Sequence, residues 1–210
     1  MPDKPSHKVT RLDRRTLRAL AHPLRVQLVE MLRTDGPATA SGLGERLGES
    51  SGTTSWHLRQ LAEYGLVDED VERGNKRERW WKAADEGHRL DTADFIDDPA
   101  SAGPLHSYLQ SSVQLRYAAE SQFIAEIAQW QGEWQHKVTF DDTRLWLTPE
   151  ETKALSEEVT AVIERYRREP RPGDTTVITH WAAFPRKSHG QSAVPEDPSA
   201  DDLDPGRTDT

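Results

Sequence analysis

Two short helical patterns separated by a tight turn constrain this chain most strongly, within residues 39–67, TASGLGERLGESSGTTSWHLRQLAEYGLV. Thr39 can cap the first helix, and Ser50 or Ser51 can cap the second through a side-chain oxygen. Gly65 suits the left-handed residue that follows a helix end. A short helix, a turn and a second helix predict a helix-turn-helix unit.

The second helix of this unit has a predicted buried face. Thr54, Leu58 and Leu61 recur at four- and three-residue spacing, so they lie on one side of a helix. Upstream, residues 12–32 carry apolar side chains at similar spacing, which predicts two more helices over about 13–21 and 23–33. Pro23 fits the first turn of the second of these helices.

A predicted β-hairpin follows directly. Alternation over residues 67–71 indicates one strand, and RERWWKAA, residues 77–84, indicates its return. Residues 73–77 form a cationic turn between them. A hairpin after a helix-turn-helix is a wing, so we expect residues 11–84 to form a winged helix with three to four helices and a β-hairpin wing.

The remaining chain is expected to be a second unit. We predict a disordered leader at 1–10, a linker at 85–104, a C-terminal domain at 105–185 and a disordered tail at 186–210. The C-terminal domain should contain a long helix from Leu105 to about Lys137, a strand or hairpin at 137–148, a helix capped by Thr148 with Glu151 completing a capping box, and a final strand at 174–184. The predicted fold class is α+β, mainly α, with a C-terminal α/β dimerisation or sensing domain.

Charge separates the two halves. Residues 1–84 hold 15 Lys and Arg against 12 Asp and Glu, a net +3, and residues 85–210 hold 12 against 24, a net −12. The basic excess permits DNA binding without proving it. The chain has no cysteine, which excludes disulfides and thiolate metal sites. No apolar run predicts a signal peptide or a membrane span, so we expect a cytoplasmic protein.

Three segments together carry a family resemblance: LRALAHPLRVQLVEML, SSGTTSWHLRQLAEYGLV and DEDVERGNKRERWWKA. Over about residues 12–84 the chain resembles winged-helix transcriptional regulators of the bacterial arsenic-repressor (ArsR) type. The resemblance implies a homodimer that reads an operator with paired recognition helices. LWLTPEETKALSEEV and the strand ending AAFP resemble the additional C-terminal domain of a longer branch. Metal-sensing members carry a thiolate cluster that this cysteine-free chain lacks, so metal sensing is not carried over.

The second helix of a helix-turn-helix meets base edges with its N-terminal residues. Small residues there allow close approach of the backbone, and free N–H groups favour a phosphate. Trp56 has two interpretations, contact with a thymine methyl or the sugar-phosphate wall, or burial against a neighbouring helix. His57 has two as well, donation to a phosphate or packing. The predicted DNA-binding residues of this helix are Ser51, Gly52, Thr53, Ser55, Trp56, His57 and Arg59.

Cations at the tip of the wing are expected to meet phosphates or the minor groove, positioning the protein rather than specifying sequence. An ordinary solvated hairpin tip is the alternative. The predicted wing residues are Arg73, Asn75, Lys76 and Arg77.

An aromatic stripe in the C-terminal half has four-, three- and four-residue spacing: Phe123, Ile127, Trp130 and Trp134. We interpret it as core or dimer seam, with a small-molecule pocket as the alternative. The eight histidines show no close pairing for a metal. Catalytic groups, a phosphate loop and a cofactor motif are also missing from the sequence, so we expect no enzyme, metal or cofactor.

The sequence therefore predicts a dimeric, sequence-specific regulator, in the repressor mode by family analogy only. Its predicted partners are double-stranded DNA, a second copy of itself and an unidentified small-molecule effector, but no membrane. One alternative is a winged helix used as a protein-interaction or dimerisation module without an operator, which the net charge of −9 fits. A second is a ligand-binding or enzymatic C-terminal domain with DNA binding secondary.

Overall fold

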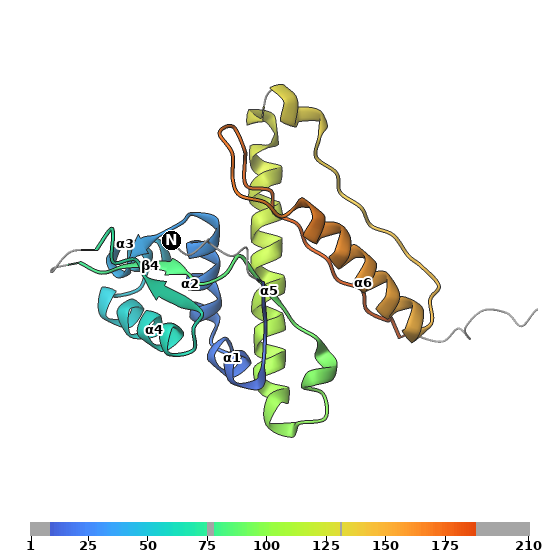
Figure 1. Cartoon of the computed structure of the whole chain (residues 1–210), viewed down its shortest axis with the longest axis horizontal. Helices are drawn as coiled ribbons and strands as arrows, with labels where there is room; N and C mark the ends of the chain where they lie inside the picture. The colour runs from blue at the N-terminus through green and yellow to red at the C-terminus, as the bar shows by residue number, and fades with distance from the viewer. Residues whose placement is uncertain (1–8, 75–77, 131, 188–210) are drawn as a thin grey trace, which may run out of the picture.

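The structure is a computed structural model that describes residues 9–74, 78–130 and 132–187 (Figure 1). It is a mixed α+β fold in which an N-terminal helix-turn-helix unit lies on one side of a long helix, α5, and a second helix, α6, lies on the other side (Figure 1).

The first two helices begin at well-formed caps. Helix α1 spans Arg14–Ala19, and the side chain of Asp13 accepts a hydrogen bond from the amide of Thr16 in a capping box. Helix α2 spans Pro23–Thr34, and Nδ1 of His22 accepts from the amide of Leu24 at 3.2 Å. The two predicted helices are confirmed, with the break at Leu20–His22.

The helix-turn-helix consists of α3 (Ala40–Leu47) and α4 (Ser51–Glu63). Thr39 caps α3, and Ser50 caps α4 by accepting from the amide of Thr53 at 3.1 Å. After α4, Gly65 has φ +69° and donates its amide to the carbonyl of Ala62. The following amide, of Leu66, donates to Leu61, which completes the helix end expected from the glycine.

Gly44 sets the distance between α3 and α4. A Cβ at this position would lie 2.8 Å from the carbonyl oxygen of Glu49 and 3.0 Å from Oγ1 of Thr54. The two helices therefore approach as closely as a bare Cα allows. A glycine inside a helix is a poor helix former, and this close approach explains why one stands here.

The wing belongs to a three-stranded antiparallel sheet ordered β2-β4-β3, with β2 at Ala38–Thr39, β3 at Val67–Glu69 and β4 at Trp80–Ala83. Val67 pairs with Ala83, and Ala38 pairs with Trp81. The predicted hairpin is confirmed, and β2 adds a strand that the sequence did not indicate. Residues 75–77 of its tip lie outside the described part of the chain.

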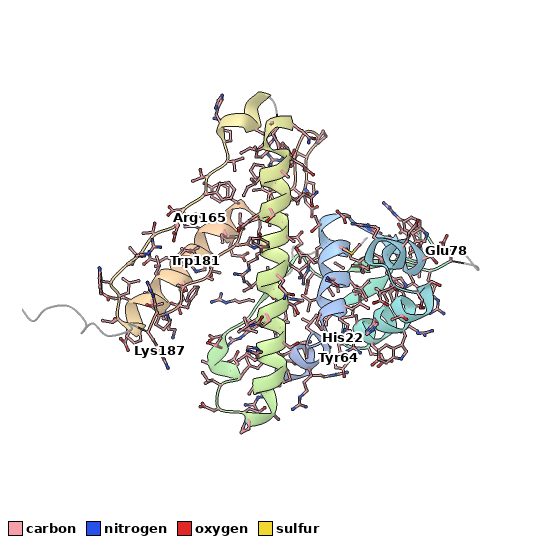
Figure 2. The ribbon with its side chains drawn as sticks, turned by 180° about the vertical axis from the view of Figure 1, so that it is seen from behind. His22, Tyr64, Glu78, Arg165, Trp181 and Lys187 are labelled. Atoms are coloured by element: carbon pink, nitrogen blue, oxygen red, sulfur yellow. The ribbon has the colours of Figure 1, made fainter. Side chains whose placement is uncertain are left out.

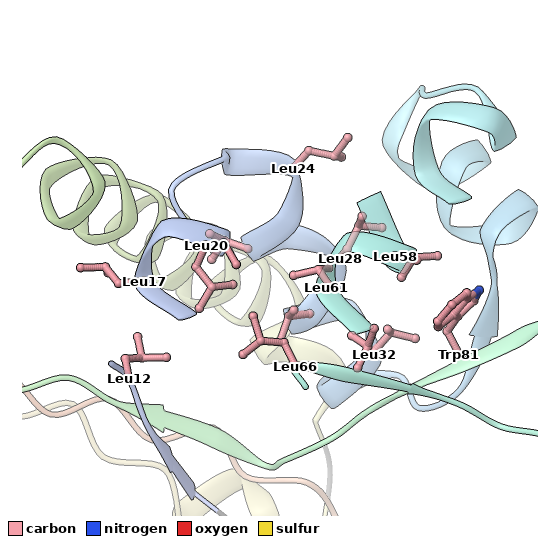
Figure 3. Packing of buried hydrophobic residues seen from close by; sticks show 14 of the residues in the cluster. Leu12, Leu17, Leu20, Leu24, Leu28, Leu32, Leu58, Leu61, Leu66 and Trp81 are labelled. Atoms are coloured by element: carbon pink, nitrogen blue, oxygen red, sulfur yellow. The ribbon is translucent and has the colours of Figure 1, made fainter. Parts of the chain in front are cut away.

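One hydrophobic core joins these elements (Figure 3). Leucines from α1, α2 and α4 meet beneath the sheet, with Trp81 closing one end. The predicted apolar faces are buried as expected: Leu12, Leu17, Leu20, Leu24, Leu28, Val29, Leu32, Thr54, Leu58 and Leu61.

Residues 85–104 differ from the predicted linker. Strand β5 (Gly87–Arg89) pairs in parallel with β1 (Val9–Arg11), which begins within the predicted leader. A 3₁₀-helix, η1, follows at Thr92–Asp94, and Phe95 is fully buried in the core. The acidic composition of this segment concealed the apolar anchor Phe95, which joins the segment to the core together with the β1–β5 pairing.

The long helix α5 spans Pro99–Glu126, with Asp98 as its N-cap, and packs against α1 and α2. It begins six residues before the predicted start and ends eleven before the predicted end. Two 3₁₀-helices follow, η2 (Ile127–Gln129) and η3 (Gly132–His136). Gly132 has φ +72°, a conformation that does not continue a helix.

Helix α6 spans Pro149–Tyr166 and begins with the predicted Thr148–Glu151 capping box. The strands expected on either side are not present. Residues 138–147 and 175–187 run without strand pairing to any residue that the structure describes. No helix within the described ranges is long and apolar enough to cross a lipid bilayer.

Candidate nucleic-acid interface

The outward face of α4 carries the small and polar side chains of the predicted recognition helix. Because Thr54, Leu58 and Leu61 turn into the core, the positions between them turn outward. Four of the predicted residues are exposed, namely Ser51, Gly52, Trp56 and Arg59, and two are half-buried, namely Thr53 and Ser55.

The first turn of α4 presents free hydrogen-bond donors. The amide of Thr53 donates to Oγ of Ser50, and the amide of Thr54 donates to the carbonyl of Ser50 at 3.0 Å. The amides of Ser51 and Gly52 have no partner among the residues placed in the structure. A Cβ at Gly52 would meet only Ser50 Oγ, at 3.8 Å, so the surface beside these amides is open. Such a terminus can accept a phosphate.

Trp56 stands out from this face and is half exposed, at 50%. The guanidinium of Arg25, on α2, lies 5.4 Å from the centroid of its ring. Arg25 is itself fixed, because Nη1 donates to the carbonyl of Ala19 at 3.1 Å and Nε donates to Nδ1 of His57 at 3.2 Å. The indole is therefore supported from one side and open on the other, which favours the DNA-facing interpretation over burial.

His57 lies in the interior, 5% exposed, and the packing alternative describes its position. It follows Thr54 by three residues, so the helical phase turns it inward. Its ring lies 4.6 Å from that of His22. Burial, with His22 and Arg25 nearby, lowers the pKa of His57 below its usual value. A neutral ring leaves Nδ1 free to accept from Arg25.

Arg25 is a member of this site that sequence analysis missed. Its position two residues after Pro23 marks it as part of the first turn of α2. The signal in the sequence was a charged guanidinium near the start of a predicted helix that is otherwise rich in leucine. The sequence does not reveal that α2 and α4 bring it to Trp56.

The described part of the wing is only partly cationic. Arg73 Nε lies 3.7 Å from Oδ2 of Asp70, and its guanidinium lies 5.9 Å from the ring centroid of Trp80. Arg73 is nevertheless exposed and can turn to a phosphate. Asn75, Lys76 and Arg77 lie outside the described residues, so their predicted contacts stay predictions.

A buried polar cluster lies where the winged helix meets α5. Arg33 donates to Oδ1 of Asp85 through Nε at 3.1 Å and also through Nη2. Oδ2 of Asp85 and Nε2 of His88 lie 3.6 Å apart, and neither has a hydrogen-bond partner among the residues that the structure describes. Burial first, and then Arg33, lowers the pKa of His88 to about 2, while burial raises the pKa of nearby Tyr108.

The end of α6 reaches the neighbourhood of this cluster through an ion pair. Nη1 of Arg167, just beyond α6, lies 3.3 Å from Oε2 of Glu86, the neighbour of Asp85 in the chain. Arg167 is also held by Glu164 at 3.1 Å. The base of the wing and the end of α6 are therefore in direct contact.

The aromatic stripe is brought together only in part. The ring of Phe123 lies 6.2 Å from that of Trp130 and 6.1 Å from that of Phe140, centroid to centroid. Ile127 is exposed, and Trp134 is half-buried on η3. A shallow hollow of about 310 Å³ lies elsewhere, beside Leu12 and Phe95, so the stripe does not line it. Within the described ranges no three metal-binding side chains converge.

Comparison with known proteins bears on the N-terminal unit. A family model described as a helix-turn-helix domain matches residues 20–70. No curated protein matches the chain. Two structures of mutant Lactococcus lactis ZitR are similar, one of them in apo form. The apo one has a TM-score of 0.29 and 14% identity, covering 70% of this chain and 84% of that one. The other has a TM-score of 0.24 and 15% identity, covering 78% and 80%.

The family match runs from the end of α1 through α2, α3 and α4 to the base of the wing. It includes every predicted contact residue of α4 and ends just before Arg73. In sequence and in arrangement, residues 20–70 are a helix-turn-helix domain.

Proposed function

We propose that this protein is a sequence-specific DNA-binding transcriptional regulator that acts as a homodimer. In the proposed complex α4 enters the major groove, with Ser51, Gly52 and Trp56 against the bases and Arg59 on the flank. The wing, with Arg73, Asn75, Lys76 and Arg77, contacts the backbone or the minor groove. Two such helices would be spaced by about 34 Å, one turn of the duplex.

The observation that carries this proposal is the outward face of α4. At the start of α4, the amides of Ser51 and Gly52 have no partner among the described residues. One turn later, the half-exposed indole of Trp56 is supported by Arg25. A winged helix that serves only for protein packing does not need such a surface. Hydroxyl groups on the same face can donate to or accept from base edges. The family match to a helix-turn-helix domain supports the same assignment.

Repression is the mode that we propose. A dimer seated across about two turns of a promoter blocks that stretch for other proteins, and this requires no further activity of the chain. Any effector of the C-terminal half would have to bind the DNA-competent and incompetent arrangements with different affinity. The Arg167–Glu86 contact is one place where the two halves could influence each other.

Selection of bound fragments from a library of genomic DNA tests the proposal, followed by titration of the selected duplex. We expect one enriched motif with two-fold symmetry, bound at least about 1,000-fold more tightly than unrelated DNA. Trp56→Ala should fold normally and lose affinity for that motif. Exposed Ile96→Ala, on the connection between η1 and α5, is the control and should bind as the parent does.

The alternative function, a protein-interaction module, predicts a different result. The pairing of Arg73 with Asp70 and of Arg79 with Glu69 favours it, since both pairs reduce the positive charge of the wing. Selection would then give no enriched motif, and binding to DNA would be weak and indifferent to Trp56→Ala. That outcome would reject the regulator proposal.

A further inference from the structure

Two extended segments in the C-terminal half have backbones without hydrogen bonds to the described residues. The last such bonds before them are from Lys137 to Trp134 and from Asp174 to Arg171. From there residues 138–147 and 175–187 make no backbone hydrogen bond to any described residue. Backbone amides and carbonyls are obligatory hydrogen-bonding groups, and rows of unpaired ones are templates for another strand.

Several side chains of these segments are apolar and exposed. Trp146 is 84% exposed and Phe184 is 80% exposed, and neither belongs to the core. The exposed apolar side chains of the two segments and of α6 are together called the C-terminal apolar surface. It contains the exposed residues Val138, Phe140, Leu145, Trp146, Leu147, Val162, Tyr166, Val177, Ile178, Trp181 and Phe184.

The area of this surface is that of a stable interface. An aromatic side chain buries 150–250 Å², so the five aromatic members alone offer about 700 Å² at their present exposure. A standard protein–protein interface buries roughly 800 Å² on each partner. Monomeric proteins seldom expose apolar patches larger than about 300–600 Å². The C-terminal apolar surface is therefore expected to be covered.

We propose that a second copy of this chain covers it, with residues 138–147 of each copy pairing as a β-strand with residues 175–184 of the other. This inference rests on the homodimer of the proposed function and assigns its interface. A two-fold axis would repeat the pairing twice, so that both open segments of both copies gain a partner and the assembly closes.

Position favours a second copy as the occupant. Trp181 and Lys187 lie on the far side of α5 from His22, Tyr64 and Glu78 of the winged helix (Figure 2). Residues 138–147 also run on the α6 side of α5 (Figure 1). A dimer formed there leaves both α4 helices uncovered for DNA, as the proposed function requires.

The oligomeric state of the full chain tests the assignment, measured by sedimentation across a dilution series. The parent should be a dimer at micromolar concentration. Trp146→Glu and Phe184→Glu should each raise the dissociation constant by about 100-fold, since each removes a large buried anchor and adds a charge. Ile96→Glu is the matched control: its side chain is 73% exposed and lies outside the surface. It should change the constant less than about threefold.

Two outcomes overturn the inference. One is a monomeric parent. The other is a dimer that resists Trp146→Glu and Phe184→Glu but dissociates on Val113→Glu, which would assign the interface to the exposed face of α5. Circular dichroism on each variant separates dissociation from unfolding.

Amide hydrogen exchange distinguishes pairing between copies from pairing within one. Residues 138–147 and 175–184 should be protected above the dissociation constant and lose protection on dilution below it. Protection that persists in the diluted monomer would mean pairing within one chain and would reject the proposal. Neither measurement uses DNA, so failure to select a DNA motif would reject the regulator function and leave this interface standing.

Discussion

The guanidinium of Arg25 lies over the indole of Trp56, 5.4 Å from the ring centroid, and joins the first turn of α2 to the outward face of α4. Arg25 donates hydrogen bonds to Ala19 and His57, so its guanidinium is fixed and supports one face of the Trp56 indole. In the proposed complex Arg25 is thus a positioning residue, acting on DNA through Trp56.

Arg25→Ala should weaken operator binding by about fivefold, since a cation–π contact at an exposed site contributes roughly 1 kcal/mol. Titrations of the parent, Arg25→Ala, Trp56→Ala and the double variant check this. If Arg25 acts through the indole, the double variant should lose little more than Trp56→Ala alone. Arg15→Ala is the matched control, because Arg15 makes the same kind of contact with Tyr64, at 5.0 Å. Additive losses would contradict the positioning role.

Two glycines of the helix-turn-helix should respond oppositely to alanine. Gly44→Ala places a methyl group against backbone at 2.8 Å, so the free energy of unfolding should fall by about 1–3 kcal/mol. Gly52→Ala makes only an ordinary contact with Ser50 Oγ, at 3.8 Å, and should leave stability within about 0.5 kcal/mol of the parent. Its methyl group would stand between α4 and the groove, so operator affinity should fall. Denaturant unfolding and DNA titration of both variants separate the two effects.

The opposite pattern would count against the interface. If Gly52→Ala binds DNA as the parent does, the first turn of α4 does not approach the duplex closely. If Gly44→Ala is as stable as the parent, α3 and α4 can separate without cost.

Local rules accounted for the winged helix because its elements carry their own start and end signals. Asp13, Thr39 and Ser50 cap α1, α3 and α4, and Gly65 ends α4; each of these is a local signal that is readable in the sequence. The strand pattern that follows Gly65 is equally local. Periodicity then assigned the buried face.

Contacts between distant segments were beyond these rules. The approach of Arg25 to Trp56, the need for Gly44 and the burial of Phe95 depend on how helices pack, which periodicity does not specify. In the C-terminal half, local rules predicted strands that are not present among the described residues. Alternating side chains indicate a strand, but a strand also requires a paired neighbour, and the described residues of one chain do not provide one.

Cations of the wing should govern the salt dependence of DNA binding. Each phosphate contact steepens the slope of log affinity against log salt by about 0.9. Replacing Arg73, Lys76 and Arg77 together by alanine should flatten the slope by up to about 2.7, with little change in motif preference. Arg168→Ala, which removes a cation paired with Asp174 in the C-terminal half, is the control. If the slope of log affinity against log salt is unchanged in the triple variant, the wing cations do not contact phosphates and the wing is an ordinary solvated hairpin.

The buried Asp85–His88 pair should make the protein sensitive to mild acid. The unfolded chain protonates His88 near pH 6.5, whereas the folded chain, with a pKa of about 2, does not. As the pH falls below 6.5 the unfolded state therefore binds one more proton, and the free energy of unfolding should drop by about 1.4 kcal/mol per pH unit from this group.

Denaturant unfolding between pH 7 and pH 5 measures this slope. His88→Gln cannot take up the proton, so its stability should fall less steeply than that of the parent over this interval. His106→Gln, at an exposed position on α5, controls for the loss of an imidazole. If the parent and His88→Gln lose stability in parallel, the folded protein accommodates the charged imidazole. Oδ2 of Asp85, 3.6 Å from Nε2, would then be its acceptor.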